Sequence, residues 1–316
     1  MGWLKNYCTL SRFEFLPATS VAILIGIFLG AGSFYELTNI AVLVHIFEGL
    51  IIFYILFNTG FMVNCWSDWK VDEKYKSRLA KAVEEIGRRN LGILVIIHLL
   101  IAFILAIHLT ISINKIEIFA LVGIGVFLGV GYSVEPIRFK SRGVFHSVMA
   151  IPVFAIPGTF SYYLVGEFSL NIFTFGFILL VIGITTYHYA LVLISQTEDF
   201  PEDCETGIKT PAVIWGIKKT VLISYSLLIF GSTFNITAFI VFFLLLNNYF
   251  LLFVILLIFA ELFPIYTIAK LNKIDVQDEL LKRIRLEMKN YPKWHGVPLC
   301  TIMLGSAIIL LLRTIS

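Results

Sequence analysis

Charged residues are scarce in this sequence of 316 residues. Asp, Glu, Lys and Arg together make up 14% of it, whereas hydrophobic residues make up 59%. Soluble globular domains carry about 25% charged residues, so this composition excludes an ordinary water-soluble domain. It indicates a multi-pass membrane protein, for which we expect a lipid bilayer as the surroundings and no nucleic acid among the partners.

Two further features are missing from the sequence. Its cysteines, Cys8, Cys65, Cys204 and Cys300, do not have the spacing of metal ligands. Because the first three are predicted below to face the cytoplasm, we expect no structural disulfides. Residues 1–12 lack the short apolar core of a cleavable signal peptide, so the first apolar span is expected to stay in the mature protein.

The sequence does contain many apolar runs that are long enough to cross a hydrocarbon core of ~30 Å, which takes about 20 helical residues. The runs are continuous rather than alternating, which predicts an all-α membrane protein. We predict nine transmembrane helices, near residues 16–35, 40–63, 91–112, 117–133, 144–165, 171–195, 220–246, 249–269 and 297–313. Residues 1–316 then form a single polytopic domain with polar cap segments near residues 64–90, 132–143, 196–219 and 270–296.

The basic residues predict how these spans are oriented. Of the 24 Lys and Arg residues, all except Lys115 and Arg313 fall in the N-terminal segment or in the loops after the second, fourth, sixth and eighth spans. Short loops rich in Lys and Arg stay in the cytoplasm. We therefore predict a plasma-membrane protein whose N-terminus and polar caps are cytoplasmic and whose C-terminus is outside.

Two acidic motifs stand where apolar runs end on the predicted cytoplasmic side. Asn64, Asp68 and Asp72 recur every four residues, so they form a column on one face of a helix, with successive residues ~6 Å apart along the axis. Asp199 and Asp203 repeat the spacing after the sixth span. A single such motif is equally well explained as a solvated helix end, but the repetition favours a site for magnesium ions bridged by a diphosphate.

Cationic residues between the two motifs suit the same anion. Arg138, Lys140 and Arg142 alternate after a proline, and in an extended segment alternate side chains face one way. Lys209 follows the second motif closely and is a further candidate for the diphosphate. For the basic loops in general, the preference of Lys and Arg for the cytoplasmic side is an alternative explanation.

Other candidates lie below or beside the acidic motifs. Phe57 and Gly60 share the helix face under Asp68 and either line a tunnel for a hydrocarbon tail or simply pack. His188 lies below Asp199 and either contacts an acceptor substrate or is a buried histidine with its hydrogen bonds satisfied. Arg12 belongs to an interfacial N-terminal segment that can anchor the protein or reach a ligand.

The order of the motifs suggests an internal duplication. The two acidic motifs follow the second and sixth spans, and the two further basic loops follow the fourth and eighth. This order predicts a duplicated four-span unit closed by a ninth helix, with the site at the interface between the repeats.

The sequence resembles the UbiA superfamily of intramembrane prenyltransferases. The resemblance is carried by an ordered set of motifs that covers most of the chain: residues 12–19 (RFEFLPAT), Asn64-x-x-x-Asp68-x-x-x-Asp72, Tyr132-Ser133-x-x-Pro136-x-Arg138-x-Lys140, Asp199-x-x-x-Asp203 and Gly207-Ile208-Lys209-Thr210. One departure is Cys65, because many members have Asp directly after the Asn of the first motif.

The resemblance implies nine helices around a central cavity and Mg²⁺, with two ions expected, held by Asp68, Asp72, Asp199 and Asp203 with Asn64 as a further ligand. Arg138, Lys140 and Lys209 would bind the diphosphate of an isoprenyl diphosphate whose tail enters the membrane interior. Tyr132 would lie near the allylic carbocation, with Ser133 beside it in the substrate site.

The function expected from the sequence is therefore Mg-dependent transfer of an isoprenyl group to a hydrophobic or amphipathic acceptor, which is aromatic, a quinone precursor or a lipid. Two alternatives stay open. A terpene cyclase would use the same ionisation followed by intramolecular capture, and an ion-coupled transporter would also show duplicated halves. Transporters place ion ligands near the membrane midplane, whereas these acids lie at the cytoplasmic ends of spans.

Overall fold

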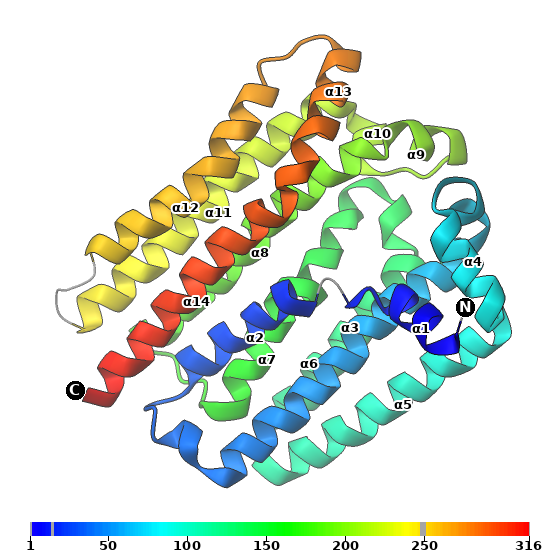
Figure 1. Ribbon diagram of the computed structural model, residues 1–316. Coiled ribbons are helices and arrows are strands. Elements are labelled where there is room, and N and C mark those ends of the chain that lie inside the picture. The colour runs from blue at the N-terminus through cyan, green and yellow to red at the C-terminus, as the bar shows by residue number, and fades with distance from the viewer. Residues whose placement is uncertain (1, 14–15, 247–250, 316) are drawn as a thin grey trace.

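The computed structural model describes all residues except 1, 14–15, 247–250 and 316. The described residues are helical or lie in turns, and they contain no strand (Figure 1). The α-helices are α1 (Trp3–Ser11), α2 (Leu16–Gly30), α3 (Ile40–Tyr75), α4 (Ser77–Ile86), α5 (Arg88–Ile113), α6 (Ile116–Ser133), α7 (Ile156–Val165), α8 (Ile172–Glu198), α9 (Phe200–Thr206), α10 (Pro211–Trp215), α11 (Ile217–Leu246), α12 (Leu251–Leu271), α13 (Gln277–Glu287) and α14 (Tyr291–Ile315). Shorter 3₁₀ or π segments are η2 (Glu36–Thr38), η3 (Phe139–Ser141), η4 (Gly143–Met149), η5 (Ile151–Ala155) and η6 (Met288–Asn290).

Membrane-spanning length is reached by eight helical stretches of the described chain. The stretch predicted as the first span forms α2, which has 15 residues and a length of ~22 Å, less than the hydrocarbon core. It ends at Gly30, where the chain turns through Gly32, whose N–H donates to Glu36 at 2.7 Å. The all-α class is confirmed, whereas the nine spans and the duplicated unit stay predictions. The two residues between the seventh and eighth predicted spans, Asn247 and Asn248, lie outside the described residues.

The fifth predicted span is not one regular helix. It runs as η4, then the π-helical η5, and only from Ile156 as the α-helix α7. Pro152 and Pro157 stand at the starts of the last two segments. Proline has no N–H to donate and clashes with the preceding turn, so the change in helix type at both prolines has a local cause.

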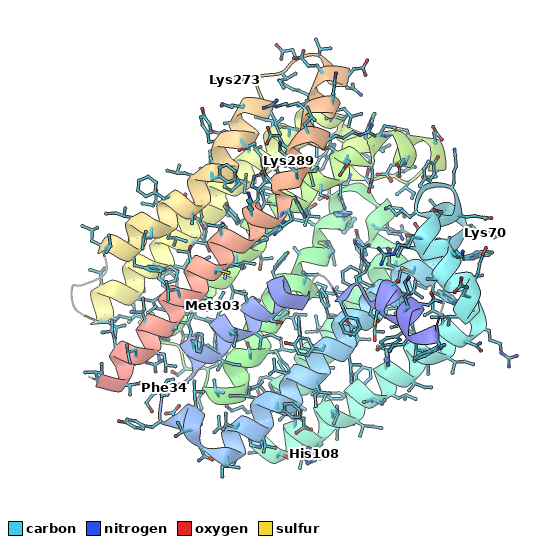
Figure 2. The ribbon with its side chains drawn as sticks, viewed as in Figure 1. Phe34, Lys70, His108, Lys273, Lys289 and Met303 are labelled. Carbon is cyan, nitrogen blue, oxygen red and sulfur yellow. The ribbon has the colours of Figure 1, made fainter. Side chains whose placement is uncertain are left out.

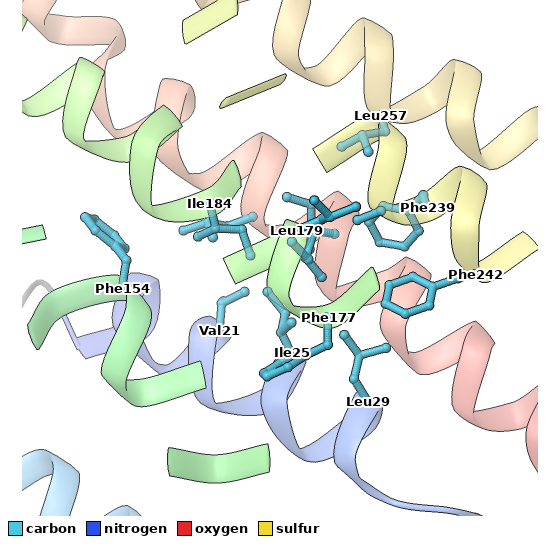
Figure 3. Packing of buried hydrophobic residues seen from close by; sticks show 14 of the residues in the cluster. Val21, Ile25, Leu29, Phe154, Phe177, Leu179, Ile184, Phe239, Phe242 and Leu257 are labelled. Carbon is cyan, nitrogen blue, oxygen red and sulfur yellow. The ribbon is translucent and has the colours of Figure 1, made fainter. Parts of the chain in front are cut away.

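The centre of the helix bundle is α8. Of its most apolar stretch 61% is buried, compared with 22% for α3, α5 and α6, whose apolar faces are left for lipid. Figure 3 shows Phe177, Leu179 and Ile184 of this helix packed among residues of α2, α11 and α12. Gly183 allows α11 to approach closely, because a Cβ there would lie 2.1 Å from Asn235 Oδ1. Small residues at such contacts are typical of membrane helix packing.

The polar cap segments gather at one end of the bundle. Helices α1, α4, α9, α10 and α13 lie at this end, and the C-terminus lies at the other (Figure 1). Figure 2 shows Lys70, Lys273 and Lys289 toward the capped end and Phe34 at the opposite one. At the opposite end, Lys115 donates to the carbonyls of Tyr163 and Gly166. The basic residues are thus separated as the sequence predicts, while the assignment of the capped end to the cytoplasm stays a prediction.

Candidate active site

Both acidic motifs line one cavity at the capped end. The cavity has a volume of about 160 Å³ and lies where the end of α3 faces the α8–α9 junction. All five residues of the motifs contribute to its wall: Asn64, Asp68, Asp72, Asp199 and Asp203. A larger depression of about 430 Å³ lies on α13 between Asp278 and Leu286. It has a single acidic residue and lies apart from the motifs, so we take the smaller cavity as the candidate site.

The first motif is carried by one uninterrupted helix, because α3 continues twelve residues beyond its predicted end at residue 63. Asp68 is held by two cations: Arg138 Nη2 lies 3.1 Å from its Oδ1, and Lys140 Nζ bonds its Oδ2. Lys140 also donates to Asn64 Oδ1 at 2.9 Å. Burial lowers the pKa of Lys140, although Asp68 opposes the effect. The result is a compact arrangement of opposite charges on one wall of the cavity.

The second motif is built on a break between two helices. Helix α8 ends at Glu198, and Pro201 stands in the first turn of the short helix α9. The N–H of Asp203 donates to the carbonyl of Asp199 at 2.9 Å. Burial raises the pKa of Asp203 to about 6, even though its carboxylate accepts a hydrogen bond from Thr210. Lys76 Nζ lies 3.6 Å from Asp199 Oδ2.

The C-terminal end of α6 is hydrogen-bonded to the first motif. Ser133 donates its hydroxyl to Asn64 Oδ1 at 3.1 Å, and its carbonyl accepts a hydrogen bond from Ser67 at 2.7 Å. Tyr132 lies in the cavity wall, where its hydroxyl is 2.7 Å from Nε2 of His146. The cavity therefore combines acids from α3 and from the α8–α9 junction with Tyr132 of α6 and Lys140 of η3.

The structure does not have the predicted row of three cations facing one way. Residues 139–141 form the 3₁₀ helix η3 and are not extended, so the alternation of side chains is lost. Arg142 donates to the carbonyls of Pro136 and Ile137. Lys140 lines the cavity. Arg138 does not line it but forms an ion pair with Asp68, which does.

Several other predicted site residues lie outside the cavity wall. Lys209 contributes its carbonyl to the N–H of Gly143, and Arg12 lies with its guanidinium 5.8 Å from the ring of Phe61. His188 is fully buried, with Nδ1 2.7 Å from Nδ1 of His295.

The two residues of the predicted tunnel face are packed differently from each other. Phe57 stacks on Phe53 and meets Phe61 edge to face. A Cβ at Gly60 would meet no atom within 4 Å. The face under Asp68 therefore combines an aromatic row with open space at the glycine.

Seven polar residues of the cavity wall were not predicted as site residues: Tyr75, Lys76, His146, Gln196, Glu202, Thr206 and Thr210. Gln196 precedes Asp199 by three residues, so helical periodicity places the two on the same face of the helix, but it does not indicate a role for Gln196. His146 is a lone histidine six residues after Lys140, and its position depends on the turn at η3 and η4. No sequence pattern marks such a residue.

The donors in the cavity fit magnesium together with a phosphate ligand. Among the described residues, no three His, Cys, Asp or Glu side chains lie where they could hold one metal ion together. Magnesium, however, keeps several waters and binds through one or two carboxylates plus substrate phosphates. The carboxylates of both motifs line one cavity together with Lys140, which matches that mode of binding.

The UbiA prenyltransferase family model matches residues 19–282. No curated protein matches the sequence.

Three solved structures show the same fold. One, of digeranylgeranylglyceryl phosphate synthase, has a TM-score of 0.69 at 15% identity, with 98% of this chain and 100% of that chain covered. A UbiA homolog from Archaeoglobus fulgidus bound to GPP and Mg²⁺ has a TM-score of 0.64 at 17% identity. The same homolog bound to DMAPP and Mg²⁺ has a TM-score of 0.64 at 18% identity, and both cover 96% of this chain and 99% of that one.

The family match extends over far more than half of the sequence. It includes both acidic motifs and residues 132–140, which lie between them in the chain. The chain belongs to the UbiA prenyltransferase family and is an intramembrane prenyltransferase.

Proposed function

We propose that the cavity between the two acidic motifs binds an isoprenyl diphosphate with two magnesium ions and transfers its isoprenyl group to a hydrophobic or amphipathic acceptor. The observation that carries the proposal is that Asp68, Asp72, Asp199 and Asp203 line one cavity together with Lys140. Similar structures have been determined with GPP or DMAPP and Mg²⁺, which supports the same ligand class here.

The acidic residues supply the binding groups for the metal. Asp68, Asp72 and Asn64 would hold magnesium on the α3 wall, and Asp199 and Asp203 on the α9 wall. When bound, magnesium neutralises the charge that builds up on the departing diphosphate.

The cations of this chain act on the same leaving group. Lys140 is buried and already lies between Asn64 and Asp68, so it meets the diphosphate without first being desolvated. A fixed cation in a water-poor site stabilises the transition state far more than it would in water. Arg138 supports it by sharing Asp68, and Lys209 would contribute only after its side chain turns toward the cavity.

The electron-rich ring of Tyr132 would lie against the allylic carbocation. Its hydroxyl is engaged with His146, which fixes the ring in the wall, and a ring face attracts a cation. Ser133 holds Asn64 in place. The isoprenyl tail would leave the cavity along α3, past Phe57 and the open position at Gly60.

The proposal includes the sidedness that the sequence predicts. The capped end, with the N-terminus and the site, would face the cytoplasm of a cell whose plasma membrane holds the protein. Arg12 would then lie at the membrane surface above the tail path, close to Phe61.

The test is a reaction with purified protein, magnesium, farnesyl or geranylgeranyl diphosphate and a panel of aromatic, quinone-precursor and lipid acceptors, followed by the mass of the product. We expect a product heavier than the acceptor by one prenyl group, no reaction after EDTA treatment, and recovery on adding magnesium. A cyclised prenyl product formed without acceptor would show that the protein is a cyclase and not a transferase. Full activity without a divalent metal would contradict the proposal.

A further inference from the structure

His146 is a cavity residue whose chemistry is not accounted for by binding the diphosphate. It lines the cavity, yet its side chain is completely buried. Its Nδ1 has no hydrogen-bond partner among the described residues. A buried ring nitrogen without a partner costs free energy, so a group that completes its hydrogen bonding is expected from the ligand.

The other ring nitrogen shows which form of the imidazole is present. Nε2 lies against both the Tyr132 hydroxyl and the side-chain amide of Gln196. A neutral ring nitrogen has one lone pair in its plane, so it cannot accept a hydrogen from both groups. A half-turn of the Gln196 amide lets Nε2–H donate to Oε1, the oxygen that otherwise has no partner among the described residues. The lone pair then resides on Nδ1.

We propose that His146 Nδ1 accepts the proton that the acceptor loses during transfer, an inference that rests on the proposed function. As the bond between C1 and the diphosphate oxygen breaks, its electron pair leaves with the diphosphate. The acceptor atom forms the new bond to C1, and its hydrogen moves as a proton to Nδ1. The attacking atom is therefore one that carries a hydrogen, either a hydroxyl oxygen or a ring carbon of an aromatic acceptor.

The surroundings of His146 suit this role. The titratable groups facing it are Tyr132 from α6, Tyr189 from α8 with ring centroids 6.0 Å apart, and Lys140 from η3. With Nε2–H donating to Gln196 Oε1, the ring is the neutral imidazole, and its Nδ1 lone pair can accept a proton. Gln196 and Tyr132 orient the ring from the other side.

The test separates ionisation from proton removal. With a prenyl diphosphate labelled by ¹⁸O in the bridging position, reversible ionisation scrambles the label into non-bridging oxygens, whether or not an acceptor is present. For His146→Gln we expect continued scrambling, and product formation lower by about 100-fold or more, the typical contribution of a general base. Wild-type transfer is expected to slow as pH falls and Nδ1 becomes protonated. This acidic limb is expected to be missing in the variant.

Control variants keep the result interpretable. His108→Gln makes the same change at an exposed histidine that pairs with Glu48 and is expected to retain wild-type transfer. Tyr132→Phe keeps the ring and removes the hydroxyl that contacts His146, so its loss of transfer should be smaller than that of His146→Gln. Scrambling in each variant also reports that the site is folded, and His146→Asn serves as a second substitution if His146→Gln does not scramble.

Three results would overturn the role of His146. These are wild-type transfer in His146→Gln, an equal loss of scrambling and transfer in both His146 variants, and a larger loss in Tyr132→Phe while His146→Gln keeps the acidic limb. A wild-type protein that neither scrambles nor transfers with magnesium would contradict the proposed function itself, which is a distinguishable outcome.

Discussion

The two acidic motifs have the same spacing but are built differently. The first lies on the continuous helix α3, where Asp68 is paired with the largely buried cations Lys140 and Arg138. The second spans the break between α8 and α9, where Asp203 accepts from a neutral hydroxyl, that of Thr210. The first motif is thus paired with largely buried cations, whereas the acids of the second have a neutral hydroxyl and the half-exposed Lys76 as partners. Changes at the two motifs should therefore have equal effects on activity and unequal effects on stability.

The largest expected effect is the loss of activity when either motif is broken. Asp68→Ala and Asp203→Ala should each lower product formation by about 100-fold or more, since each removes a charge that stabilises the reacting complex. Only Asp68→Ala removes the carboxylate that two largely buried cations share, so it should cost about 3 kcal/mol of stability, compared with about 1 kcal/mol for the lost Thr210 hydrogen bond. Activity assays and thermal unfolding in detergent measure the two effects.

Glu205→Ala is the matched control for this comparison. Glu205 lies on α9 next to the second motif but is exposed, where it pairs with Lys74 and Tyr75. These partners lower the pKa of Glu205 below its usual value, so it is fully ionised at neutral pH. Near-wild-type activity and stability are expected. If Asp203→Ala destabilised the protein as much as Asp68→Ala, the distinction between the motifs would be wrong.

A cysteine beside each motif gives a second way to compare them. Cys65 follows Asn64 and is buried against α1, α4 and α5, whereas Cys204 follows Asp203 and is exposed. A maleimide that cannot cross membranes should label Cys204 from the cytoplasmic side and leave Cys65 largely unlabelled, because a thiol must be accessible to react. Magnesium with a non-hydrolysable prenyl diphosphate should slow labelling of Cys204.

Exposed Cys8 serves as a cytoplasmic control that the ligand does not protect. Labelling of Cys204 from outside the cell would reverse the predicted orientation. Fast labelling of Cys65 would show that the helix packing around the first motif opens in the membrane.

The helices below the two motifs differ as well. Gly60 on α3 has open space beside it, whereas a Cβ at Gly183 on α8 would collide with Asn235. Gly60→Trp should therefore fold and shift substrate preference toward shorter prenyl diphosphates, by about tenfold if it removes one to two kcal/mol of tail binding. Gly183→Ala should lower the unfolding temperature instead. Competition between prenyl diphosphates of different length measures the first effect, and an unchanged chain-length profile would place the tail elsewhere.

Much of this arrangement was predictable from the sequence because it depends on local spacing. The four-residue repeats of Asn64, Asp68 and Asp72 require only that the helix continue, and the structure shows that α3 does. That these residues lie at the same end of the bundle as Asp199 and Asp203 followed from the predicted orientation of the spans. The all-α class followed from the long apolar runs.

What escaped prediction depends on tertiary contacts. Arg142 appeared equivalent to Arg138 and Lys140 in an extended segment, but the turn of η3 directs it to backbone carbonyls. His146 reaches the cavity only because η4 follows that turn and is fastened to the carbonyl of Lys209. His188 has the correct helical phase but packs against His295 from α14, a neighbour that no local pattern indicates.

The smallest expected effect concerns Lys76, the cation nearest Asp199. Its ammonium group lies 3.6 Å from the carboxylate, and both side chains are about half exposed. Lys76→Ala should raise magnesium affinity by about two- to fivefold, since an exposed pair contributes 0.2 to 1 kcal/mol. Lys74→Ala removes a more exposed cation that pairs with Glu205 and should change affinity less. Weaker magnesium binding in Lys76→Ala would make Lys76 part of the ligand site instead of a competitor.

The central claim is that both motifs hold one ligand, and a binding measurement on four proteins tests it most directly. Wild type, Asp68→Asn, Asp203→Asn and the double variant would be titrated with a non-hydrolysable prenyl diphosphate, with and without magnesium. If the motifs share the ligand, wild type binds only with magnesium, each single change abolishes most of that binding, and the double change adds little, because coupled residues are non-additive. Magnesium-independent binding, or losses that simply add, would contradict a shared site.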